Sequence, residues 1–243
     1  MTPAWSDLYS EEELRVARAG GYFAPVGMGH RPVVLVIDVT YDFTGDQGDT
    51  HFESIAKFRL SCGPAAWTAI PHIQRLLAGA RAAGIPVVYC RPNKRLQTVR
   101  RPKNSRSIDD TPESRRRGNE FPEEIAPAPG EEVIEKPRPS AFFQTPLLSL
   151  LRQLGADHLI VAGISTSGCV RATVFDGFSH DFGITVVEEC VFDRFPTSHK
   201  ANLFDMDSKL ADVLPLAEVL SNMDNADPEA SAVAVGNAVA DES

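Results

Sequence analysis

The chain has 243 residues, 43% of them hydrophobic, and a formal net charge of −9. This composition allows one sizeable core and excludes collagenous and wholly disordered chains. The acidic balance argues against a nucleic-acid partner, because binding a polyanion relies on clustered Lys and Arg. A basic run at residues 94–117 departs from this balance, and we expect a solvated loop there.

No stretch approaches the ~20 apolar residues that cross a bilayer, so we expect no membrane partner. Residues 1–15 lack the layout of a secretory signal. The cysteines are scattered without the spacing of a zinc site, which suits reduced thiols. We therefore expect a cytoplasmic protein in which one cysteine is free to react. The four are Cys62, Cys90, Cys169 and Cys190.

An N-terminal arm, residues 1–30, precedes the first predicted strand. It holds one short helix, at whose start Ser10 and Glu13 have the spacing of a capping box. The arm has apolar residues enough to pack on its own subunit or on a neighbour. The main domain is predicted at 31–221, and the polar, Ala-rich residues 222–243 predict a disordered tail.

Short apolar runs and helical periodicity alternate along the main domain. The runs that predict strands lie at 33–37, 85–89, 132–135, 158–162 and 184–188. The periodic segments that predict helices lie at 65–83, 146–154, 167–182, 198–206 and 214–220. Residues 92–130 are rich in Pro, Arg and Ser and predict mainly a long loop. This order predicts a single α/β domain, a three-layer αβα sandwich with a mainly parallel sheet that binds ligands beyond the carboxyl ends of its strands.

Residues 161–171 predict a buried strand, a tight turn and a helix with Cys169 in its first turn. A helix N-terminus carries partial positive charge, which stabilises a thiolate and lowers the cysteine pKa. The same backbone N–H groups suit an oxyanion formed when a carbonyl is attacked. A buried, inert cysteine is the alternative interpretation of this pattern.

Asp38 and Lys136 each follow a predicted strand, so a parallel sheet brings both to the edge that carries Cys169. Taken singly, Asp38 fits a turn cap and Lys136 a surface charge. Together, an acid, an amine and a thiol at three strand ends favour a nucleophile with groups that adjust and shuttle its proton.

Three sequence blocks, residues 34–44, 135–147 and 163–173, resemble the signature regions of the isochorismatase-like cysteine hydrolases. Within that superfamily they look most similar to the N-carbamoylsarcosine amidohydrolases. The resemblance spans residues 31–220. It implies the isochorismatase-like fold and hydrolysis of an amide-type C–N bond, either carbamoyl or primary amide, in a small carboxylate-bearing substrate. It also implies release of ammonia through a thioester-type intermediate, no cofactor, and a homotetramer.

The resemblance also implies roles for individual residues. Cys169 matches the family nucleophile, Asp38 the general acid/base and Lys136 the third member of the triad. The family's cis peptide bond maps to Ile164 and Ser165, and its oxyanion hole to the backbone N–H groups of Ser165 and Cys169.

Arg194 lies just beyond the strand predicted at 184–188 and matches the family's carboxylate-binding arginine. A guanidinium grips a carboxylate through two parallel hydrogen bonds, which orients the substrate. The alternative is a structural pair between Arg194 and Asp193. Arg171 and Arg138 are the other candidate ligands.

Nicotinamidases of this superfamily carry an Asp-x-His metal motif where this chain has residues 89–94, which lack it. We therefore expect no metal site, and His72, His158 and His199 fit surface or core positions. Rival functions remain open: a vinyl-ether hydrolase of the isochorismatase type, a maleamate-type amidase, and a non-catalytic binding module.

Overall fold

The computed structural model describes residues 3–94 and 111–224. Six strands form one sheet in the order β3-β2-β1-β4-β5-β6, and every neighbouring pair is parallel. The predicted single-domain α/β fold is confirmed, with a sheet that is wholly parallel. The strands are β1 (Pro32–Ile37), β2 (Val87–Pro92), β3 (Glu132–Lys136), β4 (His158–Ile164), β5 (Gly183–Phe192) and β6 (Asp212–Leu214).

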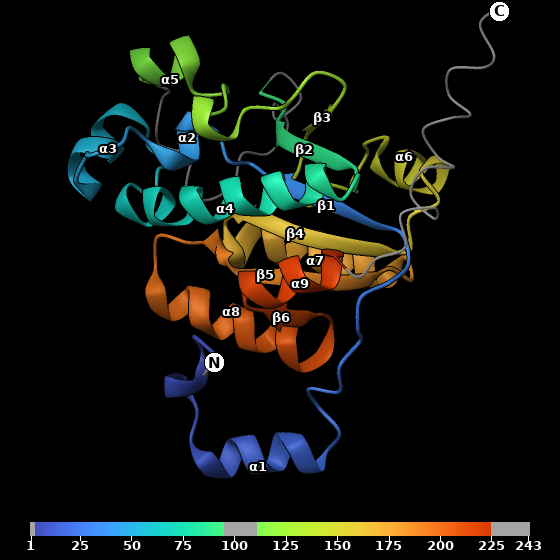
Figure 1. Cartoon of the computed structure of the whole chain (residues 1–243). Helices are drawn as coiled ribbons and strands as arrows, with labels where there is room; N and C mark the ends of the chain where they lie inside the picture. The colour runs from blue at the N-terminus through green and yellow to red at the C-terminus, as the bar shows by residue number, and fades with distance from the viewer. Residues whose placement is uncertain (1–2, 95–110, 225–243) are drawn as a thin grey trace, which may run out of the picture.

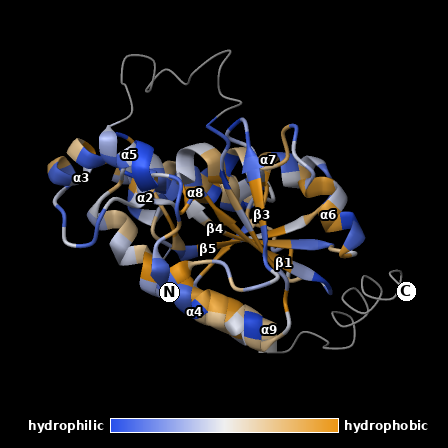
Figure 2. Cartoon of the chain, turned by 90° about the horizontal axis from the view of Figure 1, so that it is seen from above, coloured by the Kyte–Doolittle hydropathy of each residue, from blue (hydrophilic) through white to orange (hydrophobic). Residues whose placement is uncertain are grey.

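Helices cover both faces of the sheet, which makes the three layers (Figure 1). All residues of β1 and β4 are buried, and burial of both faces explains why these strands are apolar except for His158 at the start of β4. Figure 2 shows this concentration of hydrophobic residues in the central strands. One face carries α4 (Pro64–Ala82) and α9 (Leu216–Asp224). The other carries α6 (Leu147–Gln153), α7 (Arg171–Ser179) and α8 (Pro196–Lys209).

Shorter helices gather beyond the carboxyl end of β1. They are α2 (Tyr41–Thr44), α3 (His51–Lys57) and α5 (Pro112–Arg117). In the part of the chain that the structure describes, no helix is long and apolar enough to cross a bilayer.

The structure differs from the sequence prediction mainly at the sheet edge and in the long loop. The edge strand β6 was not predicted, because three partly exposed residues are too few for a periodic pattern. The region 92–130 contains α5 and a 3-10 turn at Glu123–Ile125 rather than loop alone. Most of the predicted basic loop and nearly all of the predicted tail lie outside the described residues.

The order of the strands reverses its direction at β1 and β4. From this pair the chain adds β2 and β3 on one side and β5 and β6 on the other. In open α/β sheets such a switch point opens a crevice at the carboxyl ends of the strands, where ligands bind. Asp38 directly follows β1, and the turn that carries Cys169 directly follows β4.

The N-terminal arm is anchored to α8 of the same chain by aromatic rings. Trp5 is buried, stacks on Phe23 with centroids 5.3 Å apart, and meets Phe204 edge to face at 5.2 Å. Tyr9 stacks on the same Phe204 ring. The predicted capping box is confirmed at the start of α1 (Glu11–Ala19), yet α1 has no buried residue and stands apart from the sheet (Figure 1).

Candidate active site

Asp38, Lys136 and Cys169 meet at the carboxyl edge of the sheet. The Lys136 Nζ lies 2.7 Å from Oδ2 of Asp38, with side chains that are 3% and 0% exposed. The Cys169 thiol lies within hydrogen-bonding reach of the same carboxyl group. Cys169 is half-buried as a residue, whereas the other three cysteines are buried.

Gly163 permits the close approach of β4 to β1 that brings these side chains together. Its φ of 116° is a conformation that favours glycine, and a Cβ there would lie 2.1 Å from the Ile37 carbonyl oxygen. Because that oxygen belongs to the backbone, no side-chain movement relieves the clash. A glycine at the end of β4 is therefore needed for the turn at 165–170 to start beside Asp38.

The turn between β4 and α7 is a wide helical turn, Thr166–Val170, in which the Val170 N–H donates to the Ser165 carbonyl at 3.2 Å. The peptide bond between Ile164 and Ser165 is cis. The Gly168 N–H also donates to the Ser165 carbonyl, at 2.8 Å. The turn thus directs several backbone amides toward its own interior next to Cys169.

Two side chains from other elements hold this turn in place. Oδ2 of the buried Asp193 accepts hydrogen bonds from the N–H and the hydroxyl of Ser167, at 2.9 and 2.6 Å. The Thr166 hydroxyl bonds to Nδ1 of His199 on α8 at 2.8 Å. The sequence had suggested Asp193 only as a partner for Arg194. Its position directly after β5, at the shared strand edge, was the signal for a role at the site.

Burial dominates the pKa shifts of Cys169 and Asp38. It raises the pKa of Cys169 to about 12; the Asp38 carboxylate adds to the rise and Lys136 opposes it. Burial also raises the pKa of Asp38, although Lys136 again opposes the shift. The expected lowering of the Cys169 pKa is therefore wrong for the resting site, because desolvation of the sulfur outweighs the neighbouring positive charge. The resting cysteine is a thiol beside the Asp38–Lys136 ion pair.

Arg194 follows Asp193 but does not pair with it through its side chain. Its Nη2 donates to the carbonyl of Leu60, in the loop after α3, while its backbone N–H donates to Oδ1 of Asp193 at 2.8 Å. Among the described residues no carboxylate forms an ion pair with Arg194. The half-buried guanidinium therefore has donors left for an anion.

The other candidate ligands have protein partners. Arg171 bonds to Asn202 on α8 at 2.8 Å, and the Arg138 guanidinium bonds to the carbonyl of Pro137 at 2.9 Å. His158 is buried and bonds to Thr185, as a satisfied core histidine would. Within 3–94 and 111–224, no cluster of three or more His, Cys, Asp or Glu side chains is arranged to hold a metal ion.

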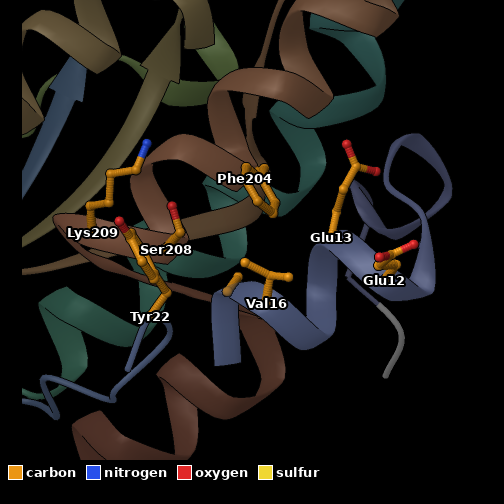
Figure 3. Close-up of a pocket in the computed structure, with 8 residues that line it drawn as sticks. Glu12, Glu13, Val16, Tyr22, Phe204, Ser208 and Lys209 are labelled. Atoms are coloured by element: carbon orange, nitrogen blue, oxygen red, sulfur yellow. The ribbon is translucent and has the colours of Figure 1, made fainter. Parts of the chain in front are cut away.

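A separate groove lies between α1 and α8, with a volume of about 510 Å³ (Figure 3). None of the predicted site residues lines it. Its polar side chains are largely engaged nearby, since Glu13 caps α1 through Ser10 and Lys209 pairs with Asp205 at 2.9 Å. The groove is a product of how the arm docks on α8, and it is distinct from the candidate active site.

Known proteins resemble both the sequence and the fold. A family model described as the isochorismatase domain matches residues 32–218. Maleamate amidohydrolase of Pseudomonas putida is 35% identical over 203 residues, which cover 82% of this chain and 89% of that protein. N-carbamoylsarcosine amidase of an Arthrobacter species is 34% identical over 210 residues, which cover 84% and 75%. A cysteine hydrolase structure from Pseudomonas syringae pv. phaseolicola shares the fold, with a TM-score of 0.70 at 21% identity over 84% of this chain and 99% of that chain.

Proposed function

The chain belongs to the isochorismatase family, and we propose that it is a cysteine-dependent amidohydrolase acting on a small carboxylate-bearing amide or carbamoyl compound. The observation that carries this proposal is the Cys169 thiol in contact with the buried Asp38–Lys136 pair. Two amidohydrolase relatives above 30% identity support it. Their printed substrates, maleamate and N-carbamoylsarcosine, both combine a carboxylate with an amide-type C–N bond.

The first half of the reaction forms a covalent intermediate. Asp38 accepts the Cys169 proton as the sulfur attacks the substrate carbonyl carbon, and the carbonyl electron pair moves onto oxygen. The proton stays on the three side chains while the negative charge passes to the substrate oxygen, and Lys136 keeps its positive charge beside them throughout. Proton transfer during the attack suits a thiol of raised pKa, because the proton leaves only as the C–S bond forms.

Backbone amides of Ser165 and Cys169 would stabilise the oxyanion. Neighbouring amides of the turn have other acceptors: that of Ser167 donates to Asp193, and those of Gly168 and Val170 donate to the Ser165 carbonyl. The amides of Ser165, Thr166 and Cys169 remain, and the proposal uses the first and the last of these three.

The second half releases the products. The oxyanion collapses, the C–N bond breaks, and Asp38 returns its proton to the departing nitrogen, which leaves as ammonia. Asp38 then takes a proton from water as the water oxygen attacks the thioester or carbamoyl-thiol carbon. The C–S bond breaks and the sulfur recovers its proton from Asp38, which regenerates the resting thiol.

Ammonia release from maleamate, N-carbamoyl amino acids and simple primary amides tests the proposal. We expect ammonia from at least one carboxylate-bearing substrate, complete loss in Cys169→Ala, and an unchanged circular dichroism spectrum in that variant. Turnover of a vinyl ether without ammonia would instead indicate an isochorismatase-type reaction. Turnover of none of these compounds would favour the binding-module alternative. The two identities, 35% and 34%, are too similar to select one of these substrates beforehand.

We further propose that residues 31–221 form the hydrolase domain behind the 1–30 arm, and that the enzyme is a cytoplasmic homotetramer. Three buried free cysteines and one half-buried cysteine support a reducing compartment. Light scattering at micromolar concentration should give four times the chain mass of 26.5 kDa. A mass of one chain would contradict the tetramer.

A further inference from the structure

A buried hydroxyl links the Cys169 turn to the loop that follows Lys136. Thr173 is fully buried on α7, one helical turn beyond Cys169. Its Oγ1 donates to the Cys169 carbonyl at 2.7 Å and accepts from the Ala141 N–H at 3.0 Å. One side chain therefore contacts the backbone of the candidate nucleophile and the backbone of a second element.

The loop that Thr173 contacts begins at Lys136. The Lys136 Nζ donates to the Arg138 carbonyl at 3.2 Å, so its ammonium is tied to the same loop. Because Lys136 also pairs with Asp38, and Cys169 contacts Asp38, the contacts close a ring around the site. The ring runs through Asp38, Lys136, Ala141, Thr173 and Cys169.

The Thr173 hydroxyl makes the one direct hydrogen bond between this loop and α7 within the described residues. The other side-chain hydrogen bonds of residues 140–145 do not reach α7: Phe142 donates to the Ser140 hydroxyl, and the Thr145 hydroxyl donates to the Ala141 carbonyl and accepts from the Leu147 N–H of α6. Apolar packing also joins the two elements, since the Phe142 ring lies close to Gly177 of α7. Packing holds the elements together, but it is non-directional, whereas a hydrogen bond fixes their relative alignment.

We propose that Thr173 is a positioning residue that fixes the separation of the Cys169 sulfur from the Lys136 ammonium during attack. The inference rests on the proposed cysteine chemistry. Attraction between two charges in a buried site changes steeply with their separation, and a displacement of about 1 Å costs a reaction about 100-fold. Loss of the hydroxyl would let α7 shift against the loop, and the forming thiolate would lose support from Lys136.

Paired substitutions test the inference. Thr173→Val keeps the branched shape and removes the hydroxyl, and Thr173→Ser keeps the hydroxyl. Thr185→Val is the matched control, because Thr185 is also a buried threonine, bonded to His158 at 2.9 Å, at the opposite end of the sheet. The measurements are kcat, KM, the melting temperature, and the rate at which iodoacetamide alkylates Cys169, followed by mass spectrometry.

We expect Thr173→Val to lower kcat about tenfold or more with little change in KM, and to slow alkylation of Cys169 by a similar factor. Thr173→Ser should stay within about twofold of wild type in both rates. Thr185→Val should lower the melting temperature and leave both rates unchanged. Wild-type rates in Thr173→Val, or equal rate losses in Thr173→Val and Thr185→Val, would overturn the inference.

Alkylation needs no substrate, so it separates the two hypotheses. Absence of ammonia release by wild type would contradict the proposed function and leave the alkylation comparison interpretable. If Thr173→Val does not fold, Thr173→Ala replaces it, with the same expected loss of both rates. A folded Thr173→Ala with wild-type alkylation would equally overturn the positioning role.

Discussion

In the proposed reaction, one proton moves between the side chains of Asp38 and Cys169 at the carboxyl edge of the sheet. Moving it from the thiol to the carboxylate leaves the total charge of the trio with Lys136 unchanged. A buried ion pair such as Asp38–Lys136 is weak evidence for stability, since desolvation of both charges offsets their attraction. In the proposed reaction, the pair supplies a base and a fixed positive charge out of water.

The fall of kcat/KM on the acid side of its pH profile should reflect protonation of Asp38. As the proposed base, its carboxylate accepts the thiol proton only when ionised, and burial raises its pKa above the usual 3.8. We expect kcat/KM to fall as the pH falls, with an apparent pKa above 3.8, measured together with circular dichroism to exclude acid unfolding. An acid limb at or below 3.8 in the folded enzyme would contradict the assignment of Asp38 as the base.

Arg194 should determine the preference for a charged substrate. We expect wild type to favour a carboxylate substrate over its neutral methyl ester. In Arg194→Ala this preference should fall by about 10-fold or more, which is the effect of losing hydrogen bonds to a charged group. The ratio of kcat/KM values for the two substrates is the measurement. Arg171→Ala is the control, because that guanidinium already bonds to Asn202.

If Arg194→Ala lowers kcat/KM equally for the carboxylate substrate and its methyl ester, Arg194 has a different role. Its Nη2 contact with the Leu60 carbonyl would then be the important one, as a tether for the loop after α3.

The turn at 166–170 and the N-terminal arm show two ways of fixing an element. Two side chains hold the turn through hydrogen bonds: Asp193, directly after β5, and His199 on α8. Burial of Trp5 anchors the arm, together with hydrogen bonds such as those that the Val26 and Gly27 N–H groups donate to Asp212. Elements with little buried surface open at low free-energy cost, so α1 should be the more easily opened of the two.

Trp5→Ala should release the arm. The substitution removes the buried ring that stacks on Phe23 and meets Phe204, a change that costs ~3–5 kcal/mol in a well-packed core. We expect trypsin to cleave after Arg15 and Arg18 many times faster than in wild type, while kcat of the proposed reaction changes little. Mass spectrometry of the fragments gives the cleavage sites.

Val16→Ser is the control for the arm, because Val16 is 67% exposed and its loss removes little packing. Identical cleavage rates in wild type and Trp5→Ala would show that other contacts anchor the arm. Loss of activity in proportion to cleavage would show that the arm supports the active site.

Across the whole molecule, a buried histidine should limit stability in acid. His158 opens β4 with 1% of its surface exposed, and burial lowers its pKa from 6.5 to about 4. In the unfolded chain the imidazole binds a proton near pH 6.5, but in the folded chain it does so only near pH 4. The free energy of unfolding should therefore fall as the pH falls from 6.5 to 4, by up to about 3 kcal/mol.

His158→Gln keeps a polar partner for Thr185 and removes the titration. Urea unfolding between pH 4 and 7 should show a shallower loss of stability in this variant than in wild type. The matched control is His30→Gln, which changes an exposed histidine and should keep the wild-type slope. The same slope in all three proteins would assign the acid sensitivity to other groups.

Much of the architecture could be read from local pattern. The continuous apolar runs predicted strands buried on both faces, because only a covered parallel sheet hides every residue of a strand. The alternation with helices then predicted the αβα layers, and placed Asp38, Lys136 and Cys169 after their strands. The short edge strand β6 could not be predicted in this way, because its three partly exposed residues show no periodic pattern.

The sequence by itself determined which residues lie at the strand ends and which family the chain belongs to, since both depend on local order along the chain. Only the tertiary structure decided the resting state of Cys169, the contact of Arg194 with Leu60 and the bridge made by Thr173. Each of these depends on groups that are distant in sequence and on how completely they exclude water. Burial and orientation arise from packing the whole chain, so no local pattern specifies them.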